Sequence, residues 1–224
     1  MRFLSILYIP SDREERVSGG HSNGINYLRL GVLASGGGTN LQSILDRSAD
    51  GSLSAEVVAV ISNNSGAKAL DRARSSGVDG LHVSAATEGS FEAADSRITR
   101  EFVSRGVDLV VLAGYMKMVG PVLLDTFRGK IINIHPALLP GFGGKDMYGM
   151  RVHEAVIAAG VNESGPTVHV VDDEYDHGLI LAQRKVPVFP DDTPETLQKR
   201  VLAVEHEILP ATIQRLAEAW GTRR

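Results

Sequence analysis

Two polar side chains interrupt an apolar run near the middle of the chain. Asn133 and His135 stand in the segment 131–140, where neighbouring isoleucines are β-branched and favour a strand and Pro136 ends it. Residues two apart in a strand point to the same face, so we expect the amide and the imidazole side by side. Such a pair at the end of a buried strand can polarise a carbonyl and move a proton. A core pair whose hydrogen bonds are satisfied by each other or by nearby backbone is the alternative that these two positions leave open.

An acidic segment further along the chain offers a third polar group. Residues 172–178 contain four carboxylates, and a solvated turn between two strands accounts for most of them. Asp176 is the exception, because it comes just before the next predicted strand and beside the flexible Gly178. If this loop folds over the end of the strand that carries His135, Asp176 would orient the imidazole and raise its pKa.

The sequence predicts neither a catalytic nor a metal-binding role for three other histidines. His169, on the strand before the acidic segment, is expected to orient the substrate or support the structure rather than to catalyse. His153 and His177 lack metal-ligand spacing with any neighbour, so no metal site is predicted. The chain has no cysteine, which excludes a disulfide scaffold, a thiolate nucleophile and any cysteine-ligated metal centre.

A glycine-rich segment, residues 35–40, follows the first predicted strand and precedes a helix. Glycines let backbone N–H groups approach an anion, and the helix N-terminus adds partial positive charge, so the segment predicts a phosphate site. A tight strand-to-helix turn is the alternative. The dinucleotide fingerprint fails, because Leu41 replaces its third glycine and the second strand ends in Asn63 and Asn64 instead of an acidic residue. No Walker lysine follows either, so a phosphate monoester fits better than NAD or ATP.

The elements that position these groups alternate along the chain from residue 28. Apolar runs of strand length alternate with segments of helical spacing, which predicts a doubly wound α/β fold with a mostly parallel sheet and a Rossmann-like N-terminal half. Thr193 is expected to cap the last helix, with Pro194 in its first turn and Pro210 bending it. The expected strands are 28–34, 56–61, 81–83, 108–113, the run ending at His135, 167–171 and 179–188, and the expected helices begin near residues 41, 67, 91, 121, 152 and 194.

The composition sets limits on partners and location. The 224 residues carry a formal net charge of −4 and no basic run, which argues against nucleic acid as the main partner. No apolar run approaches the ~18–20 residues that span a bilayer, so no membrane contact is expected and a cytoplasmic location fits. Residues 1–27 are expected to be an N-terminal extension, an edge strand and then a linker, whose role the sequence leaves open. Residues 28–224 are expected to form a single domain.

Four segments of the chain follow one another as in a known enzyme family. They are 34–42, 111–117, 133–140 and 172–178, and together they resemble phosphoribosylglycinamide formyltransferase. This family moves a formyl group from 10-formyltetrahydrofolate to glycinamide ribonucleotide in purine synthesis. The resemblance covers about residues 28–220 and implies a formyltransferase fold, with a nucleotide-phosphate half at about 28–128 and an active-site and folate half at about 129–220.

The resemblance also implies roles for individual residues. The family's catalytic trio matches Asn133, His135 and Asp176, with Asn133 and a protonated His135 stabilising the oxyanion while Asp176 keeps the imidazole charged. Matches to the ribonucleotide phosphate and ribose contacts are Gly38, Thr39, Asn40 and Glu205. Matches to the folate contacts are Met116, Lys117, Met118, Val119, Asp172, Asp173, Glu174 and Tyr175.

Some positions depart from the family pattern, and some questions stay open. Lys117 stands where arginine is frequent, Leu202 where some members have a polar residue, and Arg97 is only the nearest candidate for a family arginine near the folate. A formyltetrahydrofolate hydrolase and a non-catalytic nucleotide-binding module are the alternative functions. The expected partners are the two small-molecule substrates, and a monomer and a homodimer are equally compatible with the sequence.

Overall fold

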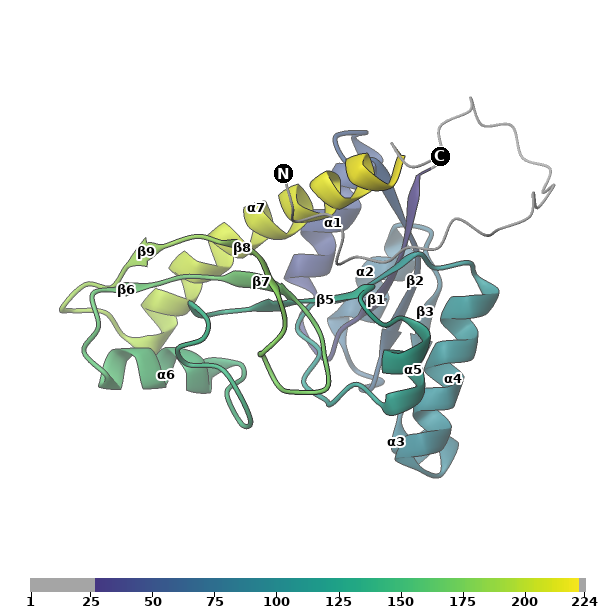
Figure 1. The fold of residues 1–224 in the computed structure, drawn as a ribbon, viewed down its shortest axis with the longest axis horizontal. Coiled ribbons are helices and arrows are strands. Elements are labelled where there is room, and N and C mark those ends of the chain that lie inside the picture. The colour runs from purple at the N-terminus through teal and green to yellow at the C-terminus, as the bar shows by residue number, and fades with distance from the viewer. Residues whose placement is uncertain (1–26, 222–224) are drawn as a thin grey trace.

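The computed structural model describes residues 27–221, so the N-terminal extension expected at residues 1–27 lies outside the described residues except for Tyr27 (Figure 1). The main strands are β1 (Leu28–Leu33), β2 (Ala55–Ser62), β3 (Gly80–His82), β4 (Leu109–Leu112), β5 (Ile131–His135), β7 (Thr167–Val170) and β8 (Ile180–Gln183). They form a seven-stranded sheet in the order β3-β2-β1-β4-β5-β7-β8. The pairs from β3 to β5 are parallel, and β7 and β8 pair antiparallel at one edge. The mostly parallel sheet is confirmed.

The strand order changes direction between β1 and β4. The chain runs outward from β1 through β2 to β3, and then returns to place β4 on the other side of β1. Open α/β sheets bind ligands beyond the carboxyl ends of the strands at such a point. The glycine-rich segment after β1 and the polar end of β5 therefore meet at one edge of the sheet.

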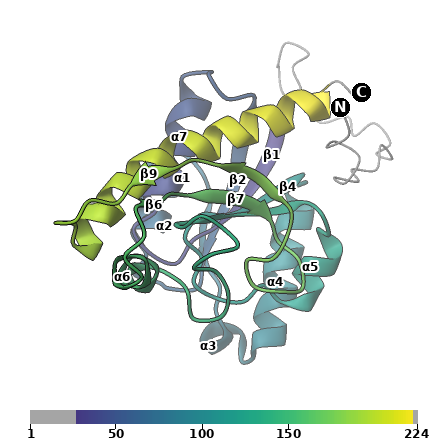
Figure 2. The same ribbon diagram turned by 60° about the vertical axis from the view of Figure 1, so that its left-hand side comes forward.

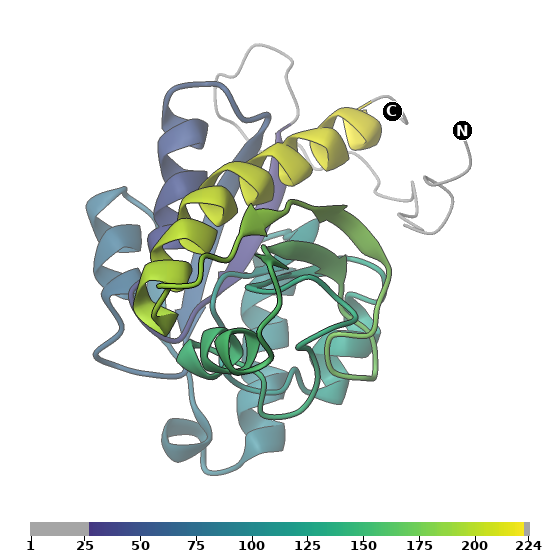
Figure 3. The same ribbon diagram turned by 90° about the vertical axis from the view of Figure 1, so that its left-hand side faces the viewer.

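Helices cover both faces of the sheet, which confirms the doubly wound fold. On one face, Leu41, Leu70 and Ile213 belong to a buried cluster with the central strands. On the other face, Phe102 and Leu123 belong to a second buried cluster. Figures 2 and 3 show the long last helix, in yellow, running along one side of the sheet. The helices are α1 (Thr39–Ala49), α2 (Lys68–Ser75) and α7 (Pro194–Gly221) on the first face, α4 (Phe91–Ser104) and α5 (Pro121–Thr126) on the second, and in addition α3 (Ala85–Glu88) and α6 (Met150–Ala158).

One predicted strand is wrong in its extent. The run 179–188 divides into β8 and β9 (Val186–Pro187), and β9 pairs with β6 (Glu163–Ser164) in a separate two-stranded sheet. Pro166 lies between β6 and β7 and has no N–H to donate, so it takes part only through its carbonyl, which accepts from the N–H of Arg184 at 3.1 Å. The apolar run in the sequence continues across this change of partner and does not reveal it.

The last helix begins as predicted, and the bend expected at Pro210 stays a prediction. The N–H of Thr196 donates to the Thr193 hydroxyl at 3.3 Å, which confirms Thr193 as the cap. Pro210 lies inside α7, which remains one helix of 28 residues. Within residues 27–221, no helix combines the length and the apolar character that crossing a membrane requires.

Candidate active site

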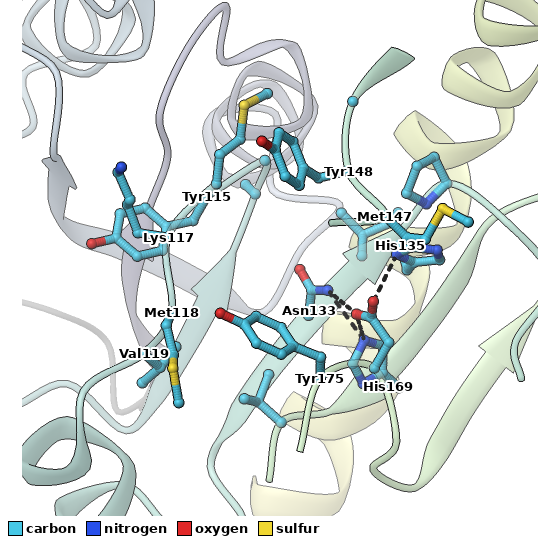
Figure 4. Close-up of a pocket in the computed structure, with 18 of the residues that line it drawn as sticks. Tyr115, Lys117, Met118, Val119, Asn133, His135, Met147, Tyr148, His169 and Tyr175 are labelled. Carbon is cyan, nitrogen blue, oxygen red and sulfur yellow. Dashed lines mark hydrogen bonds and ion pairs between the residues drawn. The ribbon is translucent and has the colours of Figure 1, made fainter. Parts of the chain in front are cut away.

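A cavity of about 700 Å³ opens at the carboxyl ends of β1, β4 and β5. Its walls are the glycine-rich loop after β1, the loop after β4, the end of β5, and two loops from the C-terminal half at residues 144–149 and 171–176. Figure 4 shows Asn133, His135 and His169 on one side of the cavity and Lys117, Met118 and Val119 on the other. The cavity therefore brings together segments from both halves of the chain at the switch point of the sheet.

Asn133 and His135 both line the cavity from β5. β5 forms because Ile131 and Ile132 are fully buried in the sheet, while its alternate polar positions share one face. His135 is 3% exposed, so it titrates in a largely dry environment. The two polar side chains do not bond to each other, because each finds partners on other segments. This disfavours a core pair whose members bond each other, although His135 does bond the backbone carbonyl of Phe142.

The carboxylate of Asp176 lies between two histidine rings. Its Oδ2 is 3.4 Å from Nδ1 of His135, and its Oδ1 is 3.4 Å from Nε2 of His169. The N–H of Gly144 donates to Oδ2 at 3.0 Å, and Nε2 of His135 donates to the Phe142 carbonyl at 2.8 Å. Asp176 has a φ of 54°, a left-handed conformation that costs a non-glycine residue about 1 kcal/mol or more. The acidic loop thus folds over the end of β5, which is the condition that the sequence analysis set for Asp176 to orient the imidazole.

Two opposing effects set the charge state of the central histidine. Burial lowers the pKa of His135, and the Asp176 carboxylate and the Phe142 carbonyl offset this only in part. Burial also opposes ionisation of Asp176, but contacts with His169, His135 and the Gly144 N–H outweigh it and hold the pKa of Asp176 below its usual value. Asp176 favours the charged imidazole, as the sequence predicted, and burial opposes it in the free protein. The site rests as an ionised carboxylate beside a mostly neutral ring.

Hydrogen bonds orient the Asn133 amide. Nδ1 of His169 donates to the Val170 carbonyl at 2.9 Å, which leaves Nε2 facing the Asn133 amide and the Asp176 carboxylate. That nitrogen accepts a hydrogen bond from the Asn133 amide nitrogen at 3.1 Å. The amide nitrogen lies 3.5 Å from Asp176 Oδ1, which is too long for a strong hydrogen bond. His169 therefore supports the amide, and a ligand oxygen would compete only with the long contact to Asp176 for the second N–H of Asn133.

His153 belongs to the site although sequence reasoning passed over it. It lines the cavity from α6, is 2% exposed, and its Nδ1 has no hydrogen-bond partner in the described part of the chain. Burial and the nearby His135 lower the pKa of His153 to about 4. It has no metal-ligand spacing with its neighbours, so the sequence pattern gave it no role. One sequence feature did indicate its burial: it stands three residues before Val156 and so shares the buried face of the helix.

The glycine-rich loop forms the wall next to α1. Gly38 has a φ of 70°, and a Cβ on it would lie 2.7 Å from the Ala69 Cα, so only glycine fits there. Asn40 Nδ2 donates to Glu205 Oε2 at 2.5 Å, which joins α1 to α7 beneath the cavity. Burial raises the pKa of Glu205, and the hydrogen bond from Asn40 offsets part of that rise. Gly38, Thr39, Asn40 and Glu205 all line the same cavity as the trio.

Comparison with known proteins decides the family. Residues 28–213 match the model of the formyl transferase family, which is most of the chain. The chain belongs to the formyl transferase family. Among its relatives, the chloroplastic phosphoribosylglycinamide formyltransferase of Arabidopsis thaliana is 40% identical over 221 residues, covering 97% of this chain and 76% of the relative. The phosphoribosylglycinamide formyltransferase of Haemophilus influenzae is 40% identical over 190 residues, covering 85% of this chain and 87% of the relative.

Solved structures agree with this assignment. The crystal structure of glycinamide ribonucleotide transformylase 1 from Symbiobacterium toebii matches this formyltransferase with a TM-score of 0.82 and 42% identity, covering 90% of this chain and 93% of that one. The family resemblance, the formyltransferase fold and the enzyme class predicted from the sequence are confirmed. Membership in the family also implies a folate-based formyl donor.

The predicted folate contacts of this formyltransferase come from two loops, one of which also carries Asp176. The predicted folate contacts all line the cavity, from the loop after β4 and from the acidic loop. Arg97 does not join them, because its guanidinium bonds Glu101 on α4, at 2.7 Å, and it is absent from the cavity wall. Asp173 is held from outside by Arg128 at 3.1 Å. In residues 27–221 no group of three or more histidines and carboxylates is arranged to hold a metal ion. The predicted contacts in the cavity are Met116, Lys117, Met118, Val119, Asp172, Asp173, Glu174 and Tyr175.

Proposed function

We propose that the protein transfers the formyl group of 10-formyltetrahydrofolate to the amine of glycinamide ribonucleotide in purine biosynthesis. The observation that carries the proposal is the convergence of Asn133, His135 and Asp176 in the cavity that the glycine-rich loop lines. An amide, an imidazole and a carboxylate suit transfer at a carbonyl carbon, and the loop suits an acceptor that bears a phosphate. The relatives named phosphoribosylglycinamide formyltransferase support the same reaction.

His135 and Asp176 serve the proton transfer. The acceptor amine loses a proton as its nitrogen bonds to the formyl carbon, and the folate nitrogen gains one as its bond to that carbon breaks. Nε2–H of a neutral His135 is bound to the Phe142 carbonyl, so the ring takes up the first proton on Nδ1. The Asp176 carboxylate, 3.4 Å from Nδ1, stabilises the imidazolium that results. His135 then gives the proton to the departing nitrogen, directly or through a water molecule. The enzyme ends in the protonation state in which it began.

Asn133 stabilises the oxygen of the tetrahedral intermediate. One N–H of its amide is held by His169 at 3.1 Å, which fixes the side chain before the substrates bind. The other N–H donates to the oxygen as negative charge develops there. The mechanism needs no covalent enzyme intermediate, which is consistent with a chain that lacks cysteine.

The two substrates occupy opposite walls of the cavity. The loop residues Gly38, Thr39 and Asn40 hold the phosphate, and Glu205 accepts a hydrogen bond from the ribose. The opposite wall fits a pteridine, because the cavity residues there combine apolar side chains from the loop after β4 with the polar acidic loop. The apolar members are Met116, Met118, Val119 and Leu124, Lys117 faces the same space, and the acidic loop contributes Asp172, Asp173, Glu174 and Tyr175.

The proposal extends to organisation and location. Residues 28–224 act as one domain, with the phosphate half at about 28–128 and the active-site and folate half at about 129–220. Both halves contribute walls to one cavity, which supports a single catalytic unit. A cytoplasmic monomer or homodimer fits this organisation, although the Arabidopsis relative is named as chloroplastic.

Turnover with the two substrates tests the proposal. Purified protein given 10-formyltetrahydrofolate and glycinamide ribonucleotide should release tetrahydrofolate, and folded protein that shows no turnover with this pair would refute it. His135→Ala should leave ribonucleotide binding nearly intact while turnover falls by about 10²-fold or more. Equal losses of binding and turnover would mark His135 as structural.

Omitting the ribonucleotide tests the hydrolase alternative. A hydrolase would use the same trio with water as acceptor, and it would release formate from the folate without any ribonucleotide. Water needs no phosphate loop, so the loop disfavours this reading. A non-catalytic module would bind the ribonucleotide and show no turnover in either assay.

A further inference from the structure

Arg72 lies on α2, on the side of the glycine-rich loop away from the cavity. Its Nε donates to the Gly37 carbonyl at 2.8 Å, and one terminal nitrogen donates to the Gln42 side chain at 2.9 Å. Both acceptors are neutral, and no carboxylate of the described chain forms a salt bridge with Arg72. Asp46 lines the same small surface pocket, but its carboxylate accepts a hydrogen bond from the Gln42 amide instead. The guanidinium charge next to the loop is thus not neutralised by a partner.

The bond from Arg72 sets the direction of a loop peptide. In a trans peptide the carbonyl and the next N–H point in opposite directions. The Gly37 carbonyl faces Arg72, so the N–H of Gly38 is turned the other way. The Gly36 carbonyl accepts a hydrogen bond from the N–H of Ala69 at 3.1 Å and so faces α2. The N–H of Gly37, in the same peptide, therefore points away from α2. Two contacts from α2 therefore hold two successive N–H groups of the loop away from the helix.

These N–H groups have nothing to bind within the protein. Gly37 and Gly38 line the cavity, and in residues 27–221 neither of their N–H groups donates to another protein atom. The loop residues 36–40 carry no positive side chain of their own. A phosphate dianion there needs donors in a fixed direction and a nearby positive charge, and α2 supplies both through the backbone of Ala69 and the side chain of Arg72.

His206 and Arg47 line the same small pocket as Arg72. Burial and the nearby Arg72 lower the pKa of His206, so this ring is neutral at pH 7. His206 therefore does not supply a second positive charge beside the loop. Arg47 lies in the last turn of α1, far along the helix from the loop at its start. Arg72 is the cation that contacts the loop backbone itself.

We infer that Arg72 is a positioning residue for the phosphate of the acceptor substrate. It holds the loop with its N–H groups toward the cavity and places a positive charge behind them. The inference rests on the proposed function insofar as the acceptor carries a phosphate. It assigns Arg72 to acceptor binding and to neither the formyl donor nor the proton transfer.

Paired variants test this role. Arg72→Gln removes the charge and the forked contact, Arg72→Lys keeps the charge, and Arg74→Gln is the control on the same helix. Arg74 is an exposed residue that bonds Asp71 and the Gly80 carbonyl. We expect Arg72→Gln to raise the KM for glycinamide ribonucleotide about tenfold or more, with kcat and the KM for the formyl donor changed by less than about threefold. Arg72→Lys should lie between this variant and the wild type.

A substrate without phosphate shows whether the effect is specific. With glycinamide riboside as acceptor, the wild type and Arg72→Gln should have equal kcat/KM, because there is no phosphate to position. An equal loss with both acceptors, or an equal loss in Arg74→Gln, would overturn the inference. Thermal unfolding of each variant shows whether it folds, and Arg72→Lys carries the test if Arg72→Gln does not.

A binding measurement keeps this inference separate from the proposed reaction. Ribose 5-phosphate, titrated by calorimetry into wild type and Arg72→Gln, requires no turnover. About tenfold weaker binding to the variant supports the role of Arg72 even if glycinamide ribonucleotide proves not to be the substrate. Unchanged affinity in a folded variant refutes the role of Arg72 even if the enzyme is active with that substrate.

Discussion

The Asp176 carboxylate and the His135 imidazole face each other at 3.4 Å across the contact between the acidic loop and the end of β5. The pair rests with its negative charge on Asp176, because burial keeps the ring of His135 mostly neutral. A proton taken up during the reaction turns this pair into an imidazolium and a carboxylate in a buried setting. The carboxylate therefore stabilises the charged ring formed during the reaction more than it stabilises the resting, neutral ring.

Asp176→Asn should lower the plateau of kcat/KM by about 10²-fold to 10⁴-fold, because the imidazolium loses its partner. Asparagine tolerates a positive φ, so the loop conformation should survive. Asp176 raises the pKa of His135, and its removal should move the acid limb of the pH profile to lower pH. The measurement is kcat/KM against pH. Asp125→Asn, which removes an exposed carboxylate paired with Arg128, is the control. An acid limb that moves upward would contradict this account.

Gly143→Ala should slow the reaction through the position of Asp176. A Cβ at Gly143 would lie 2.5 Å from Cδ2 of Leu139 and 3.2 Å from Cβ of Asp176. The loop must shift to accept it, and a small displacement of the carboxylate should lower kcat about tenfold or more. Steady-state kinetics with both substrates measures the effect. Gly66→Ala is the matched control, since its Cβ would meet only the Asn64 side chain at 3.8 Å. Unchanged kcat in Gly143→Ala would show that the loop absorbs the methyl group without moving Asp176.

The sequence predicted the layers of the fold because periodicity reports burial directly. The segment 91–104 was expected to be a helix and is α4, and the apolar run at 108–113 contains β4 at the centre of the sheet. Both elements are defined by their own residues. The division at Pro166 was not predictable, because it depends on which partner each strand finds.

Parts of the site depend on backbone conformations that residue types do not reveal. Phe142, Asp146 and Asp176 have positive φ values of 54°, 68° and 54°, and non-glycine residues rarely adopt them. The two loops meet at Asp176 through these turns, so their approach could be guessed only from the family resemblance. The neutral state of His135 likewise follows from burial among several elements, which a single strand pattern does not show.

His153→Leu should make the protein more stable in acid. The folded-state pKa of His153 is about 4, below its ordinary value of 6.5, so the unfolded chain binds the proton more readily. Stability is lost as pH falls from about 6.5 toward 4, and at pH 5 the loss is about 1–2 kcal/mol. Leucine does not titrate and leaves no unpartnered Nδ1, so the variant should lose less stability between pH 7 and pH 5. Urea unfolding at the two pH values measures this. His177→Leu, at an exposed histidine, is the control. An equal loss in wild type and His153→Leu would show that His153 is accessible to water when folded.

Glu205→Gln should weaken acceptor binding without slowing the chemical step. Glutamine keeps the size of the side chain and can still accept the hydrogen bond from Asn40, but it is a weaker acceptor for a ribose hydroxyl. We expect the KM for glycinamide ribonucleotide to rise about tenfold while kcat and the donor KM change little. Initial rates over a matrix of both substrates measure the three constants. Glu207→Gln is the control, because Glu207 lies on the same helix, is exposed and pairs with Arg184. A fall in kcat at unchanged acceptor KM would instead mean that Glu205 acts on the transition state, since only interactions made there alter kcat without altering binding.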